Sequence, residues 1–305
     1  MPPSPVSLRR RLALLAIAAA GVVGGSGVAT SCSSGNGPVL PFTPTTPAPL
    51  PVPIDNVIVV EGRPLRRRRG RLHYARSRAS GLWVTDAATL QMSRHVRALL
   101  AQHWARAGEL EHASVIAFED LARRLIRVRA DQSLVERARH AAAQEQEHSR
   151  RCFDLASRYA GRHITHGVLR VPRRRPRGRS AEISALAVEA LRDGVVNEGY
   201  AAWLAAAQRD RAHDSEVRDT LAVIANDEAA HAELSHDVLE WCLLHGGPAT
   251  RAAVDAAYAC LPRRMTGPSI PAADPPVLGE LAAHGLVEVD ADGAGYRKVL
   301  AALVA

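Results

Sequence analysis

The sequence predicts an all-α protein whose centre is a four-helix bundle made of two antiparallel hairpins. Apolar residues make up 47% of the 305 residues, but aromatic residues only 4%, and Ala dominates. This composition favours packed helices, because Ala is a strong helix former and strands prefer aromatic and β-branched residues. Four long stretches rich in helix formers follow one another between residues 88 and 245. The gaps between them are short, long and short, which predicts two hairpins joined by one long crossover.

The first 31 residues are predicted to be an export signal. Residues 9–11 are all Arg, and residues 12–23 form an apolar segment of a length typical of signal peptides. The segment is too short to cross a bilayer, which takes about 20 residues. Small residues ending in Cys32 resemble a bacterial lipobox, in which the cysteine is lipidated. Ordinary signal-peptidase cleavage is the alternative, because Ala29 stands where Leu is commonest.

The signal at residues 1–31 predicts an exported protein of the bacterial cell envelope, facing the periplasm. A lipid on Cys32 would anchor it in the membrane. Residues 32–54 are rich in Pro, Ser and Thr. They predict an extended tether, because such a composition cannot bury a core. Residues 55–87 are predicted to be an irregular or weakly strand-like N-terminal extension.

The formal net charge of +8 comes mostly from Arg, much of it in two runs at residues 66–69 and 173–179. No aromatic platform interleaves with these runs, so we interpret them as solvated loops and expect no nucleic-acid partner. The four cysteines include no C-x-x-C pair. That absence argues against a zinc ribbon, a rubredoxin-type iron site or a dense disulfide framework. Whether Cys242 and Cys260 pair in an oxidising compartment stays open.

The helical pattern places the elements in order along the chain. The four bundle helices are expected at residues 88–129 (with a possible break near Gly108), 132–160, 181–209 and 214–245. The crossover takes up residues 161–180, and a Gly-Gly-Pro sequence ends the fourth helix at residues 246–248. A helical C-terminal extension is expected over residues 246–305, with helices near 251–260, 278–284 and 293–304.

Glu-x-x-His occurs four times, and on a helix this spacing places both side chains on one face. Two of the pairs, Glu145/His148 and Glu228/His231, lie on apolar helical stripes. The pairs Glu109/His112 and Glu233/His236 continue into polar residues, so we expect them on the surface. The phase of the pattern therefore selects two pairs as candidate metal ligands.

The same test selects one carboxylate from each remaining helix, Glu111 from the first and Glu198 from the third. Glu189 shares a face with Glu182 and Asp193 and is expected to meet water. Four buried carboxylates cannot all stay ionised without compensation, because desolvation and mutual repulsion are each costly. Two cations would neutralise them, and an oxygen-rich site with one imidazole per ion suits Fe or Mn. The alternative is a set of buried salt bridges to Arg, although the inward stripes contain no Arg or Lys.

With these residues in place, residues 88–245 resemble the ferritin-like di-iron carboxylate superfamily. The shared pattern is one Glu, Glu-x-x-His, one Glu and Glu-x-x-His along four helices. Residues 111–118 and 227–234 look particularly like exported bacterial members. The resemblance implies two iron ions, with Mn or a mixed Fe/Mn pair as alternatives, and O2 or peroxide as the partner at open coordination positions.

The resemblance also implies a role for each ligand. Glu145 and Glu228 would bridge the ions, Glu111 and His148 would complete one shell, and Glu198 and His231 would complete the other. Because the chain lacks the C-x-x-C pairs of rubrerythrin, electrons would come from an external donor. Two histidines in the site depart from cage ferritins, and the tether and tail would obstruct a closed cage, although an oligomer remains possible.

The leading hypothesis is an O2- or peroxide-reactive di-iron oxidase or oxygenase of unknown substrate. The alternatives are a non-catalytic, iron-sequestering lipoprotein and a helical scaffold with a vestigial site. Cys152, Tyr159 and Trp104 lie on the ligand stripes, and we expect them to be core residues rather than reactive groups.

Overall fold

The computed structural model describes residues 57–58, 62–66, 72–83, 92–169, 177–266, 270, 273–288, 290 and 292–304. The predicted export signal, the tether and Cys32 lie outside these residues. Over the described part of the chain, none of the helices combines the length and hydropathy that crossing a membrane requires.

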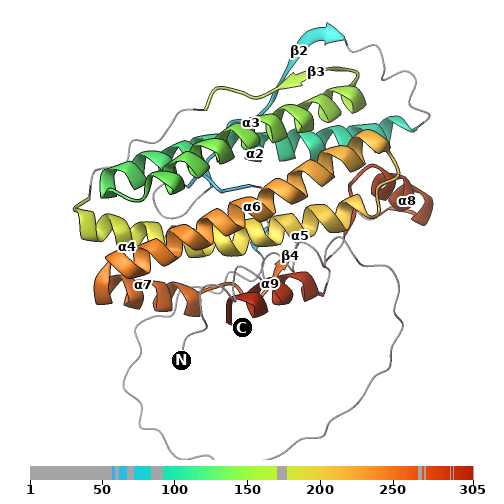
Figure 1. Ribbon diagram of the computed structural model, residues 1–305. Helices are drawn as coiled ribbons and strands as arrows, with labels where there is room; N and C mark the ends of the chain where they lie inside the picture. Colours follow the sequence, from blue (N-terminus) through green and yellow to red (C-terminus); the bar gives the residue numbers. More distant parts are fainter. Residues whose placement is uncertain are drawn as a thin grey trace, which may run out of the picture.

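Most of the described chain is helical, so the predicted all-α class is confirmed. Four long helical segments lie side by side in two pairs (Figure 1). The first pair consists of α2 (Arg94–Val128) and α3 (Gln132–Ala160). In the second pair, α4 (Arg179–Glu189), η3 (Ala190–Val196) and α5 (Asn197–Arg209) run end to end as one segment beside α6 (Ser215–His245). The connections within each pair are short, and the long connection joins α3 to α4.

Local sequence explains where these helices begin and end. The side chain of Ser93 accepts a hydrogen bond from the Val96 amide and caps α2, and Asp214 caps α6 in the same way through Val217. Gly161, with φ at 67°, ends α3 in the left-handed conformation. The break considered at Gly108 does not occur. A Cβ there would lie 3.1 Å from the Phe153 ring, so the missing side chain allows α2 and α3 to pack closely.

The third segment differs from the uninterrupted α-helix predicted for residues 181–209. Ala190–Val196 forms a π-helix, a rare conformation often found at functional sites. Within it, Gly194 lies against α6, where a Cβ would come within 2.2 Å of the Ser235 side chain. The periodicity of the sequence did not reveal this segment.

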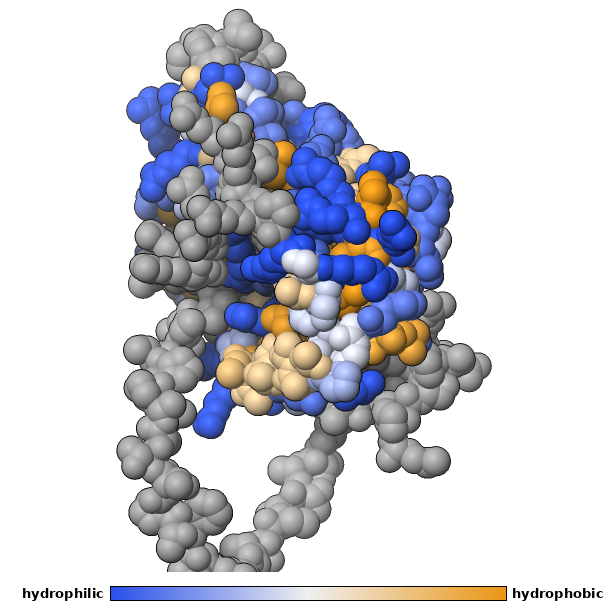
Figure 2. Space-filling model, turned by 90° about the vertical axis from the view of Figure 1, so that its left-hand side faces the viewer, coloured by the Kyte–Doolittle hydropathy of each residue, from blue (hydrophilic) through white to orange (hydrophobic). Residues whose placement is uncertain are grey.

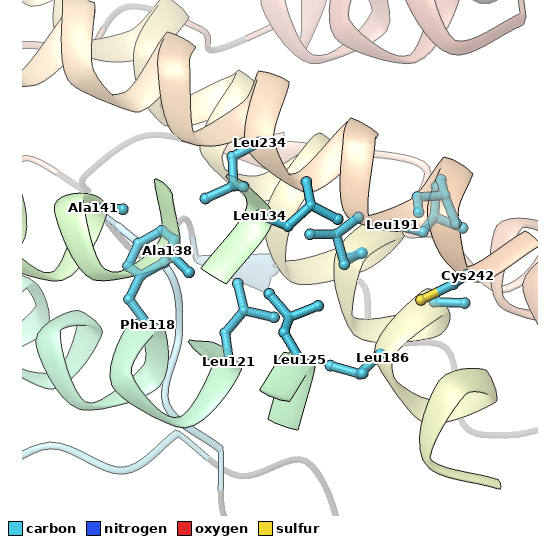
Figure 3. Close-up of a cluster of buried hydrophobic side chains, with 14 of the residues drawn as sticks. Phe118, Leu121, Leu125, Leu134, Ala138, Ala141, Leu186, Leu191, Leu234 and Cys242 are labelled. Atoms are coloured by element: carbon cyan, nitrogen blue, oxygen red, sulfur yellow. The ribbon is translucent and has the colours of Figure 1, made fainter. Parts of the chain in front are cut away.

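Two apolar clusters fill the two ends of the packed helices. One lies toward α4, where side chains from α2, α3, η3 and α6 point toward one another (Figure 3). Its members include Phe118, Leu121, Leu125, Leu134, Leu186, Leu191 and Leu234. The second cluster lies toward the α5–α6 connection and includes Leu100, Trp104, Cys152, Leu155, Tyr159, Val217 and Leu221. The middle of the helices, between these clusters, holds the polar residues described below.

Short strands and helices surround these segments. β1 (Val57–Ile58) pairs in parallel with β4 (Met265–Thr266), and β2 (Arg78–Trp83) pairs antiparallel with β3 (Arg162–Thr165). The C-terminal extension contains α7 (Gly247–Ala259), α8 (Pro275–Ala283) and α9 (Ala294–Val304). The expected Gly-Gly-Pro stop is only a bend, because α7 begins at once at Gly247, with φ at 70°. Seen from the end where α4 and α7 lie, the surface is mostly hydrophilic with smaller apolar areas (Figure 2).

Candidate metal centre

All six residues selected from the sequence lie in the middle of the packed helices. Glu111 comes from α2, Glu145 and His148 from α3, Glu198 from α5, and Glu228 and His231 from α6. Each is buried: His231 is 2% exposed and the other five are 0% exposed. Burial of four carboxylates and two imidazoles in one place is costly unless cations or protons compensate.

The ligand atoms fall into two groups, each compact enough to surround one metal ion. Glu111, Glu145, His148 and Glu228 form the first group, and Glu198, Glu228 and His231 form the second. Nδ1 of His148 lies 3.6 Å from Glu145 and 3.9 Å from both Glu111 and Glu228. Nδ1 of His231 lies 3.4 Å from Glu145 and 3.8 Å from Glu228. Glu145 and Glu228 are therefore close to both imidazoles.

The two histidines are oriented by a matching pair of residues. Nε2 of His148 is 2.9 Å from Oδ2 of Asp227, and Nε2 of His231 is 3.1 Å from Oε1 of Gln144. Gln144 also donates to Asp227 over 2.7 Å. Each orienting residue directly precedes a glutamate of the opposite pair, so the two halves repeat the same arrangement. The hydrogen bonds at Nε2 turn both Nδ1 atoms toward the carboxylates, as in metal sites with an outer-sphere partner for His.

Several inward-facing atoms lack a partner in hydrogen-bonding geometry among the described residues. These are both carboxylate oxygens of Glu111 and Glu145, one oxygen of Glu198, and Nδ1 of His148 and of His231. Buried polar atoms are nearly always satisfied in folded proteins, so such a concentration needs an explanation. Metal cations would satisfy all of these lone pairs at once. The donor set therefore fits one or two metal ions.

Burial and proximity shift the pKa values of these groups in opposite directions. Burial raises the pKa of Glu111 well above its usual range, and the Glu145 charge raises it further. Burial likewise raises the pKa of Glu198, which Arg63 opposes. Burial alone would raise the pKa of Glu145, but the proximity of Glu111, His148 and His231 lowers it overall. Without metal, protons take the place of the missing positive charge.

His148 titrates unusually high in the metal-free centre. Burial alone would lower its pKa, but the hydrogen bond to Asp227 and the nearby carboxylate of Glu145 raise it to about 9. Burial would also raise the pKa of Asp227, yet the hydrogen bond to His148 lowers it. A metal ion at Nδ1 would have to displace the proton that this arrangement favours.

A segment of the N-terminal extension, residues 62–66, closes the centre and was missed by the sequence analysis. The Gly62 carbonyl accepts a hydrogen bond of 2.9 Å from the Asn197 side chain. Gly62 has φ at 68°, and a Cβ there would lie 2.7 Å from Glu111 Oε2 and 2.4 Å from Ser114 Oγ. Only glycine fits so close to the carboxylates. No periodic pattern marks this segment, so the sequence offered no indication of its position.

Arg63 brings a positive charge next to the centre. It is 4% exposed and donates a hydrogen bond of 3.1 Å to Ser235 on α6. The next arginine, Arg66, forms an ion pair of 2.8 Å with Asp193 in η3. The inward stripes contain no Arg or Lys, as the sequence indicates, but Arg63 reaches the centre from a segment outside the helices.

The face that carries Glu189, Glu182 and Asp193 is less exposed than predicted. Glu182 and Asp193 are buried, and Glu189 is partly buried. The reason is Arg124 of α2, which is 3% exposed and binds both Glu182 and Glu189. An ion pair across two helices thus covers a face that was expected to meet water.

The two remaining Glu-x-x-His pairs are also less exposed than predicted. Glu109 is buried and accepts hydrogen bonds from the Ser77 amide and hydroxyl, because residues of the N-terminal extension cover this part of α2. His112 stacks on His166 of the crossover. His236 is buried, whereas Glu233 is partly exposed. Their exclusion from the central cluster holds, but the predicted solvent exposure is wrong.

The other residues considered near the centre belong to the core. Cys152, Tyr159 and Trp104 are almost fully buried in the apolar cluster toward the α5–α6 connection. Tyr159 and Trp104 hydrogen-bond to His284. Cys242 and Cys260 are free thiols, so the disulfide considered from the sequence is not formed.

Comparison with known proteins gives no match: no family model, curated protein or solved structure is similar to this chain. The functional argument therefore depends on the geometry of the centre.

Proposed function

We propose that this chain is an exported, ferritin-like di-iron protein that reacts with O2 or peroxide. The observation that carries the proposal is the buried cluster of Glu111, Glu145, His148, Glu198, Glu228 and His231, several of whose inward atoms have no protein partner in the described residues. Four carboxylates and two imidazoles form the donor set that the ferritin-like pattern supplies to a metal pair.

Iron is favoured over zinc by the chemistry of the donors. Carboxylate oxygens outnumber imidazole nitrogens four to two, and no cysteine belongs to either ligand group. Structural zinc sites usually contain thiolates or more histidine, whereas oxygen-rich sites with imidazole suit Fe or Mn. A bound iron pair would supply the electrons with which O2 or peroxide is reduced.

The residues of the chain would hold the ions, orient the ligands and keep water out. Glu145 and Glu228 are placed to bridge, because each lies near both imidazoles. Asp227 and Gln144 hold the imidazole rings with Nδ1 inward. The two apolar clusters on either side of the centre limit access of water along the helices.

The surroundings of the centre favour a small reactant. A large groove of about 750 Å³ between α2 and the β2–β3 pair is lined by Tyr74, Arg97, Tyr159 and their neighbours, and by none of the six cluster residues. A cavity of about 10 Å³ adjoins Gly62, which in turn lies against Glu111. Such a cavity has room for about one molecule the size of water. None of the six cluster residues lines either space, and all six are buried, so the enclosure of the centre favours O2, peroxide or Fe(II) over a bulky organic substrate.

Iron sequestration without catalysis is the second candidate, favoured by the same enclosure of the centre. Metal analysis and stopped-flow mixing of the Fe(II)-loaded protein with O2 separate the two functions. An oxidase should consume O2 rapidly and show a transient absorbing species, whereas a sequestering protein should react slowly and without features. Less than one metal ion per chain after growth in iron would contradict both and favour a helical scaffold with a vestigial site.

Matched variants test whether the cluster is the site. Glu228→Ala and His231→Ala should lose metal, because both residues belong to the second ligand group. Glu233→Ala and His236→Ala, one turn further along the same helix, should retain it. Equal loss of metal in both pairs would contradict the assignment.

The export signal and lipid anchor are part of the proposal and rest on the sequence alone. Labelling with a radioactive fatty acid should mark the wild-type chain but not Cys32→Ala. Absence of label from the wild type, with the chain released after processing, would favour ordinary signal cleavage.

A further inference from the structure

The two ligand groups of the centre are not equivalent. The first group contains four donors, and the second contains three, with Glu228 common to both. Each group contributes one imidazole, so the difference is one carboxylate. Glu145 also lies 3.4 Å from Nδ1 of His231, so the number of donors alone does not rank the two positions.

Arg63 lies on the side of the second group. Its Nη1 donates to Ser235 Oγ over 3.1 Å, and the Ser235 hydroxyl donates to Oε2 of Glu198 over 3.5 Å. Ser235 thus links Arg63 to a ligand of the second group. The guanidinium of Arg63 also lies 5.5 Å from the centroid of the Phe118 ring, and that ring is 4.8 Å from the His231 ring. Both ligands found only in the second group are therefore neighbours of Arg63 or of its partners.

The fold makes a specific place for this arginine. Gly194 in the π-helix has no side chain, and a Cβ there would lie 3.1 Å from Arg63 Nη1. On one side of Arg63, the Asn197 side chain at the start of α5 donates to the Gly62 carbonyl. On the other side, Asp193 of η3 binds Arg66. Arg63 is anchored between these two contacts, so its charge stays beside the centre.

The charge of Arg63 opposes a cation in the second position. A guanidinium stays protonated even when buried. At comparable distances it repels a divalent ion twice as strongly as it attracts a singly charged carboxylate. Arg63 therefore favours the ionised form of Glu198 but repels the divalent ion that Glu198 would bind.

The orienting residues act in the same direction. His148, in the first group, is held by the carboxylate of Asp227, whereas His231, in the second, is held by the neutral amide of Gln144. A carboxylate partner makes an imidazole the stronger metal ligand. Arg63 and the orienting residues therefore both favour the first position.

We propose that the centre has one tight and one exchangeable metal position, and that Arg63 sets the difference between them. The tight position is formed by Glu111, Glu145, His148 and Glu228, and the exchangeable one by Glu198, Glu228 and His231. The inference rests on the proposed metal-binding function and adds an order of loading to it. Arg63 acts as a positioning residue through its charge and contacts no substrate.

Calorimetric titration of the full chain with Co2+, which stands in for Fe2+ without reacting with O2, tests this ranking. The wild-type chain should bind two ions in steps that differ at least about tenfold in affinity. Arg63→Met should tighten the second step about tenfold, while Arg63→Lys should keep the two steps apart because it keeps the charge. Glu198→Gln should abolish the second step and leave one ion bound at the affinity of the first.

Other outcomes overturn the inference. An unchanged or weaker second step in Arg63→Met shows that the charge of Arg63 does not rank the positions. Loss of the tight step in Glu198→Gln reverses the assignment of the two positions. Circular dichroism checks that each variant is folded, and Arg63→Gln, which keeps a donor for Ser235, replaces the Met variant if that one unfolds. Failure of the wild type to bind any Co2+ or iron contradicts the metal centre itself and is distinguishable from a failed ranking.

Discussion

The ends and the middle of the same four helical segments are built for different purposes. At the ends, residues such as Leu125 and Leu100 are completely buried in apolar clusters. In the middle, Glu111 and Glu198 are just as deeply buried but belong to a cluster of acidic side chains. Apolar burial stabilises the fold by about 25 cal/mol per Å2 of surface removed from water, whereas burial of carboxyl groups without partners destabilises it. The ends therefore stabilise a middle whose acidic groups could hold metal cations.

Leu125→Ala should show the largest effect and should damage only stability. The free energy of unfolding should fall by about 2–5 kcal/mol, because a cavity replaces a completely buried side chain. Chemical denaturation measures the change, and metal analysis should give an unchanged metal content per folded chain. A loss of metal in a folded variant would break the separation between ends and middle.

Addition of metal should increase the free energy of unfolding, and this gain should depend on the buried Glu and His residues in the middle of the helices. At a free metal concentration of about 100 to 1,000 times the dissociation constant, unfolding should become harder by about 3–4 kcal/mol. Thermal melting with Fe2+ under anaerobic conditions, followed by addition of a chelator, measures the gain and its reversal. His231→Ala should lose most of it, and an equal gain in that variant would place the bound metal elsewhere.

Glu111→Leu should replace one buried acid in the middle of the helices with an apolar side chain like those at the ends. Without metal the variant should be more stable than the wild type, by up to about 4 kcal/mol, because a buried acid is replaced by an apolar side chain of similar size. Its metal content should fall, since Glu111 belongs to the first ligand group. Comparison of melting curves of the metal-free proteins checks this. A variant less stable than the metal-free wild type would mean that the carboxyl group is satisfied in ways that the geometry does not indicate.

A rise in pH should have the smallest effect on stability, and the metal-free and metal-saturated proteins should respond in opposite directions. The folded-state pKa of His148 is raised from 6.5 to about 9, so its contribution is complete below pH 6.5 and is lost as the pH rises through about 9. The raised pKa values of Glu111 and Glu198 act in the same direction, because these acids hold protons in the folded state that they lose on unfolding. The metal-free protein should therefore melt at a lower temperature at pH 9 than at pH 6.5, by the equivalent of about 1 kcal/mol or more.

The metal-saturated protein should not lose stability in this way, because a bound cation has already displaced these protons and metal affinity rises as ligands deprotonate. Melting curves of both forms across the same pH range provide the comparison. Parallel curves would show that the centre does not control the pH dependence.

The helical pattern was sufficient to predict the all-α class, the extent of α3 and the burial of all six candidate ligands. Periodicity works well for such residues because Glu145 and Glu228 lie on stripes of apolar residues along long helices. Periodicity did not predict burial that is caused by another part of the chain. The pattern of its own helix predicts that Glu109 is exposed, but Ser77 covers it.

Arg63 is the clearest example of what the sequence pattern could not reveal. It lies in a short, non-helical segment, and neither its neighbours nor its spacing relates it to Ser235 or Glu198. Arg124 is a second example, because its partner Glu182 is 58 residues away along the chain. Contacts between distant residues of opposite charge leave no periodic trace, so only the folded structure shows them.

The position of Arg63 also has a consequence for the order of folding. The hydrogen bond between Arg63 and Ser235 joins residues 172 positions apart, so it closes one of the longest loops in the chain. Contacts that close long loops form late, because the entropy of closure must first be offset by more local structure. Arg63, which is synthesised before all four long helical segments, would thus be among the last residues to dock. Metal that enters before this step would meet an open centre, and metal that enters afterwards would have to pass the docked segment.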